Sequence, residues 1–152
     1  MRTTKDDLEF HIEFAKKMIS DRGELYPMVV GIIGTKRVTY PFVVSNDVDL
    51  RVQSNNIKDK LRRLGADSLV VLTEVWTVKL RHPALYSPDI DVRSHPDCKK
   101  SLLILYVKKI STVRVIIPII KVFDSIEFGE QSIVIYKTVN DKQWGDTFKT
   151  GV

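Results

Sequence analysis

Glu74 is the residue whose setting in the sequence most directly suggests acid–base chemistry. It falls in the strand-like segment 68–80, where Leu72, Trp76 and Val78 share its face. A carboxylate on an apolar face must be paired, protonated or at the rim of that face. Burial of an isolated carboxyl group suits it to work as a general acid or base. The alternative is a structural ion pair with a lysine or arginine across the sheet.

The segment 81–100 contains a second set of reactive side chains. His82, His95 and Cys98 could together form a zinc site with one cysteine and two histidines. Neither the C-x-x-C nor the H-x-x-x-H spacing of common zinc sites occurs, so the alternative is a polar loop fixed by prolines. We therefore predict that the protein has no metal site. If it had one, His82, His95 and Cys98 would be the candidate ligands. Loops this long in a compact domain tend to be functional or disordered.

Motifs for nucleophilic catalysis and for nucleotide cofactors are missing from the sequence. There is no G-x-S-x-G elbow around a serine, and no nucleophile motif surrounds Cys98. Gly31 and Gly34 flank a predicted hairpin and do not form the G-x-x-x-x-G-K phosphate loop. We therefore predict no cofactor.

Basic residues cluster on one predicted helix and at one predicted turn. The candidates for contacts to nucleic-acid phosphates are Lys58, Arg62, Arg63, Lys108 and Lys109. If the helix and the turn share a side of the molecule, these residues form a positive patch able to hold phosphates. Aromatic residues for base stacking are not interleaved with them. The alternative is a solvated surface that aids solubility.

Composition places the chain among soluble, single-domain proteins. Its 152 residues include 43% hydrophobic and 28% charged residues, with a net charge of +5. The single cysteine fits a reducing compartment. No secretory leader is recognisable, and no apolar run has the roughly 20 residues of a membrane-spanning helix. We expect a cytoplasmic protein without a membrane partner.

The hydrophobic periodicity predicts two helices and several strands. The first helix is expected at 4–21, where Leu8, His11, Ile12 and Ala15 share a face. The second is expected from Ser54 or Asn55 to Gly65, and residues 45–51 before it are expected to form a loop. The strands are expected at 28–33, 36–44, 68–80, 102–107, 112–120 and 132–138, with a turn through Gly129 over 125–131.

Four strands in succession after the second helix favour an antiparallel arrangement. We predict an α+β fold with a single antiparallel sheet of about five to six strands, a mixed edge being allowed, and two helices packed on one face. Residues 1–139 are expected to form one domain and 140–152 a polar C-terminal tail.

The start of the chain shows a family likeness. The residues Phe14-Ala15-Lys16-Lys17-Met18, followed by Arg22-Gly23-Glu24-Leu25-Tyr26-Pro27-Met28, resemble the start of a group of small uncharacterised prokaryotic α+β proteins. Pro118 and Phe128-Gly129-Glu130 are similar to that pattern too. The resemblance implies an α+β fold. It implies no activity, so no functional residues are carried over.

Three functions are compatible with these patterns. The first is a binding or interaction module that forms a homodimer, because a small sheet with two apolar faces and only two helices leaves a face or an edge to cover. The second is a basic accessory protein that binds nucleic acid or another acidic partner. The third is a small enzyme with Glu74 as its general acid or base.

Overall fold

The computed structural model describes residues 4–42, 50–77, 98–109 and 111–137. The elements within them are α1 (Thr4–Arg22), β1 (Met28–Ile33), β2 (Lys36–Pro41), α2 (Leu50–Arg63), β3 (Ser68–Thr77), β4 (Lys99–Val107), β5 (Ser111–Val122), β6 (Ser125–Phe128) and β7 (Ser132–Lys137). The predicted α+β fold with one antiparallel sheet is confirmed. The predicted tail at 140–152 and most of the 81–100 segment lie outside the described residues.

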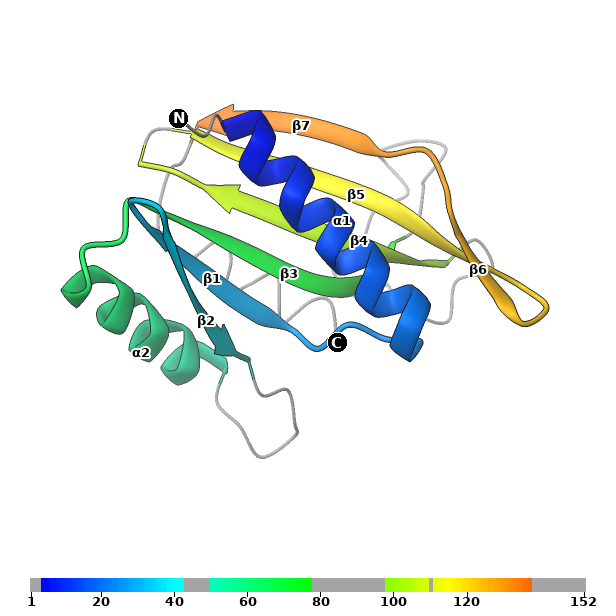
Figure 1. Ribbon diagram of the computed structural model, residues 1–152, viewed down its shortest axis with the longest axis horizontal. Helices are drawn as coiled ribbons and strands as arrows, with labels where there is room; N and C mark the ends of the chain where they lie inside the picture. The colour runs from blue at the N-terminus through cyan, green and yellow to red at the C-terminus, as the bar shows by residue number, and fades with distance from the viewer. Residues whose placement is uncertain (1–3, 43–49, 78–97, 110, 138–152) are drawn as a thin grey trace, which may run out of the picture.

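The described strands form one sheet in the order β2-β1-β3-β4-β5, and β6 and β7 both pair with the outer edge of β5 (Figure 1). Every pairing is antiparallel. Strand β7 pairs along Ser111–Ile116 and β6 along Ile119–Val122. Pro118, which has no N–H to donate, lies in β5 between these two pairings, and its carbonyl accepts the Gly129 N–H at 2.9 Å. The expectation of a plain turn over 125–131 was wrong, because it missed β6.

The two helices cover opposite faces of the sheet, and the expectation that both pack on one face was wrong. Helix α1 buries Ile12, Ala15 and Ile19 against one set of alternating strand residues, which includes Leu72 and Ile104. Helix α2 packs on the other set. Ile57 and Leu61 there contact a core formed with Val29, Val71, Leu103 and Leu105. Because neighbouring strand residues point to opposite faces, the two cores are separate layers.

Helix α1 follows its sequence signals closely. Asp6 and Asp7 lie in the first turn and Arg22 in the last, which suits the helix dipole at both ends. Gly23 ends the helix with a φ of 82°, and its N–H donates to the Ile19 carbonyl at 2.8 Å. The predicted inward face is confirmed, since His11 and Ala15 are buried.

Helix α2 begins at Leu50, before the Ser54 or Asn55 cap expected from the sequence. Ser54 is buried inside the helix and therefore does not start it. The helix lies close to β1, since a Cβ atom added to Gly31 would be 2.2 Å from Cδ2 of Leu61. A larger residue than glycine at this contact would force the Leu61 side chain to shift. Within the described residues, neither helix has the length and apolar character needed to cross a bilayer.

Candidate nucleic-acid interface

A basic groove lies where the C-terminal half of α2 meets the end of β4. It has a volume of ≈ 290 Å³. The side chains of Leu61, Leu69 and Val107 supply its apolar part. The charged residues that line it are Lys58, Arg62, Asp67, Lys108 and Lys109. Four of the five predicted phosphate-binding residues therefore meet around one concave surface, although they are far apart in the sequence.

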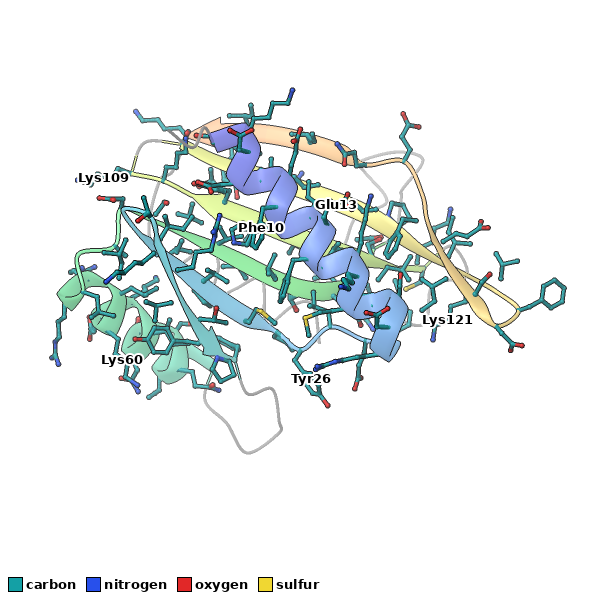
Figure 2. The ribbon with its side chains drawn as sticks, in the orientation of Figure 1. Phe10, Glu13, Tyr26, Lys60, Lys109 and Lys121 are labelled. Carbon is teal, nitrogen blue, oxygen red and sulfur yellow. The ribbon has the colours of Figure 1, made fainter. Side chains whose placement is uncertain are left out.

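The sheet register brings these residues together. Leu69, at the start of β3, pairs with Val107, at the end of β4, so the turn after β4 lies beside the connection from α2 to β3. Lys58 and Arg62 are four residues apart and share one face of α2. Figure 2 shows Lys109 and the α2 residue Lys60 at the same end of the molecule. The turn thus adds its positive charge to that of the helix.

The five predicted basic residues are not equivalent. The Nζ atom of Lys108 hydrogen-bonds the Thr4 hydroxyl and lies 5.5 Å from the centroid of the Tyr106 ring. Both contacts place its ammonium group on the α1 side of the sheet, although the residue also lines the groove. Arg63 is an exposed residue of α2 outside the lining. Lys58, Arg62 and Lys109 are therefore the residues best placed to present cations to a bound anion.

Among the residues that the structure describes, two acidic groups near the groove, Asp59 and Asp67, offset part of this charge. Asp67 lines it, and its Oδ2 atom accepts a hydrogen bond from the Gly34 N–H at 3.4 Å. Asp59 lies 4.0 Å from Arg62, and both side chains are largely exposed, so this ion pair is weak. The C-terminal end of a helix carries partial negative charge. The attraction for anions must therefore come from the basic side chains.

Glu74 lies on the α1 side of β3 and has a partner at each carboxylate oxygen. Its Oε2 atom is 2.8 Å from Nζ of Lys100, and its Oε1 atom accepts the Leu25 N–H at 3.1 Å. Its side chain is only 13% exposed. This is the cross-sheet ion pair that the sequence allowed as the alternative to catalysis. A role in acid–base catalysis stays a prediction, and Glu74 lines neither the basic groove nor the groove beside Phe10 and Phe14.

The predicted metal candidates are mostly outside the described residues. His82 and His95 fall in 78–97, so the structure does not place them. Cys98 is a free, half-buried thiol next to β4. Among the residues that the structure describes, no three histidine, cysteine or acidic side chains gather as metal ligands would.

A buried polar cluster joins α1 to the sheet, and the sequence patterns did not reveal it. Asp7 pairs through Oδ1 with Nη2 of Arg37 at 2.8 Å and accepts the Tyr106 hydroxyl through Oδ2 at 3.2 Å. Nδ1 of His11 lies 2.6 Å from the Asp7 carbonyl oxygen. The only local signal was the spacing of Asp7 and His11 on one helix face. Arg37 and Tyr106 belong to distant segments of the sequence, and no short motif can indicate that they contact Asp7.

Burial raises the pKa of Tyr106 above its ordinary value of 10.0. The hydrogen bond with Ser68 opposes this rise, whereas the negative charge of Asp7 adds to it. Tyr106 therefore stays a neutral hydrogen-bond donor at physiological pH. The cluster connects α1 with β2 and β4 through Asp7 and acts as a clamp between them.

No known protein family, curated protein or solved structure matches this chain. The resemblance to small uncharacterised prokaryotic proteins stays a prediction.

Proposed function

We propose that this protein is a non-enzymatic binding module that holds nucleic-acid phosphates in the groove between α2 and the end of β4. The observation that carries the proposal is the convergence of Lys58, Arg62 and Lys109 on one concave surface. A net charge of +5 favours approach of a polyanion from a distance.

The chemistry of the groove favours contacts with the backbone over reading of bases. Arginine can hold a phosphate through two parallel N–H donors, and lysine supplies a mobile point charge. No aromatic ring lines the described part of the groove, so it offers no stacking platform for bases. We therefore expect binding with little sequence preference and with strong salt dependence.

A binding titration tests this proposal. A fluorescein-labelled 20-base DNA strand and the corresponding duplex are titrated with the wild type and with the Arg62→Gln/Lys109→Gln variant at one low salt concentration. The groove variant should bind at least about tenfold more weakly, which is about 1.4 kcal/mol.

The matched control removes two positive charges at the opposite end of the sheet. Arg22 ends α1 and Lys99 begins β4, and both are exposed. The Arg22→Gln/Lys99→Gln variant has the same net charge as the groove variant. Equal losses in the two variants would show that overall charge, and not the groove, governs binding, and would contradict the proposal.

Self-association is a second candidate function, favoured by apolar side chains exposed on one side of the molecule. Phe10 and Phe14 on α1 are 50% and 40% exposed, and Ile133 and Ile135 of β7 are also exposed. Pairing two copies is the commonest way to cover such surfaces. Size-exclusion chromatography with light scattering at micromolar concentration tests it. A dimer is expected, and a monomer at every concentration would contradict it.

A further inference from the structure

The β5–β6 hairpin ends in an exposed aromatic residue. Val122 pairs with Ser125, so Phe123 and Asp124 alone form the turn. Phe123 is fully exposed, at 101% of its reference surface. Figure 1 shows the hairpin extending past the ends of the neighbouring strands. We call this hairpin, Ile119–Phe128, the finger.

Phe123 adopts a turn conformation that is unfavourable for its side chain, and its ring is not buried within the described residues. Its φ is 54°, in the left-handed region that glycine and asparagine adopt readily and that a phenylalanine adopts at an energetic cost. A fully exposed ring recovers none of that cost by burial. Strained residues with no compensation in their own chain are often held for a contact elsewhere.

The outer face of α1 carries a complementary surface. The rings of Phe10 and Phe14 are stacked, with centroids 6.5 Å apart and planes inclined by 12°. The Arg37 guanidinium lies 4.3 Å from the centroid of the Phe10 ring and supports it. These two rings line an open groove together with Glu13, Lys16, Lys17 and Ser20. We call it the aromatic groove.

We propose that Phe123 of one copy binds in the aromatic groove of a second copy, and that the second copy returns the same contact. The charges around the two surfaces are complementary. Lys121 of the finger can face Glu13 of the groove, whereas Asp124 and Glu127 of the finger can face Lys16 and Lys17. In Figure 2, Glu13 lies on α1 and Lys121 lies on the finger.

The tip of the finger does not enter the groove of its own chain, because Phe123 is fully exposed, so the contact we propose joins two copies. The base of the finger rests on its own α1, where Nζ of Lys16 lies 5.5 Å from the centroid of the Phe128 ring. The tip lies beyond that contact with Phe123 fully exposed. If a two-fold axis relates the two copies, each finger binds the aromatic groove of the other copy. Both contacts then form together, and the assembly closes as a dimer. This inference rests on the proposed self-association and names its interface.

Analytical ultracentrifugation of four proteins tests the interface. The wild type should dimerise, and Phe123→Gly should raise the dimer dissociation constant roughly a hundredfold, because two phenyl contacts are lost at once. The glycine also removes the backbone strain, so the melting temperature of the monomer should not fall. Phe14→Glu should disrupt the dimer from the groove side. The control, Leu64→Thr, removes an exposed apolar side chain just after the end of α2 and should leave the dimer intact.

Charge reversal gives a readout that lost folding would not produce. Glu13→Lys and Lys121→Glu should each weaken the dimer, and the two together should restore it. A monomeric wild type would overturn both the interface and the proposed self-association. A wild-type dimer that survives Phe123→Gly and Phe14→Glu would overturn this interface alone. A monomeric wild type that binds lipid vesicles only when Phe123 is present would assign the finger to a membrane surface instead.

Discussion

Asp7 of α1 and Arg37 of β2 form an ion pair of 2.8 Å whose side chains are only 11% and 19% exposed. The pair links the first turn of α1 to the edge strand β2, and the two residues are 30 positions apart in the sequence. Since Asp7 also accepts the Tyr106 hydroxyl, one carboxylate connects a helix with two separate strands. The position of α1 on the sheet depends on this connection as well as on its apolar face.

Replacing Asp7 with asparagine should destabilise the protein by about 2 to 3 kcal/mol, somewhat below the roughly 3 to 5 kcal/mol of a fully buried pair. The physical reason is that Arg37 keeps its charge in a largely desolvated place without its counter-charge. Urea denaturation followed by circular dichroism measures the loss. Glu9→Gln is the control, because the Lys5–Glu9 pair is exposed at 4.0 Å and should change stability by at most about 0.5 kcal/mol. Equal effects of the two substitutions would contradict the clamp.

The raised pKa of Tyr106 predicts a loss of stability at alkaline pH. The unfolded chain releases this proton near the ordinary pKa of 10.0, whereas the folded chain holds it to higher pH. Above pH 10 the unfolded state thus binds fewer protons, so stability falls as pH rises through the folded pKa. The stability difference between the wild type and Tyr106→Phe should be constant up to about pH 9 and shrink above pH 10. Parallel pH profiles of the two proteins would exclude this linkage.

Glu74 and Lys100 should behave as a coupled structural pair. Glu74→Gln should cost about 1 to 2 kcal/mol, because the carboxylate is largely buried but stays near solvent through Lys100. A double-mutant cycle with Lys100→Met should give a coupling energy of at least about 0.5 kcal/mol. Unchanged stability in Glu74→Gln would argue against the structural role and would revive the hypothesis of acid–base catalysis.

Gly31→Ala tests the packing of α2 against its own face of the sheet. The added methyl group would meet Leu61 and should cost about 1 to 3 kcal/mol through overpacking. Leu61→Ala removes the obstacle but leaves a cavity, so the double variant should lose less stability than the sum of the two single variants. Strictly additive losses would mean that α2 does not lie against β1 at this point.

The strands could be predicted from sequence because their signals are local. The β-branched and apolar runs that form β4 and β5 are recognisable within a few residues, and most of the expected strand bounds agree with the structure to within a few positions. Strand β6 was missed because its turn lacks the usual glycine or asparagine. Phe123 occupies the left-handed position instead.

The layer that each helix covers could not be predicted from the local pattern. The side of the sheet that α2 covers depends on the path of the chain from the edge strand β2 across β1 to β3. That path is decided by tertiary contacts such as Gly31 with Leu61. The basic groove was predictable in composition, through Lys58, Arg62 and Lys109. Its assembly required the register of β3 with β4, which brings the turn to the helix.

The salt dependence of DNA binding tests the central claim, that the groove holds phosphates, most directly. The slope of log affinity against log salt concentration reports how many phosphates the protein neutralises. We expect a steep negative slope for the wild type and a slope that is shallower by about 1.4 to 1.8 for Arg62→Gln/Lys109→Gln, since two phosphate contacts are lost. Identical slopes for the two proteins, or wild-type binding that does not weaken as salt rises, would contradict the claim.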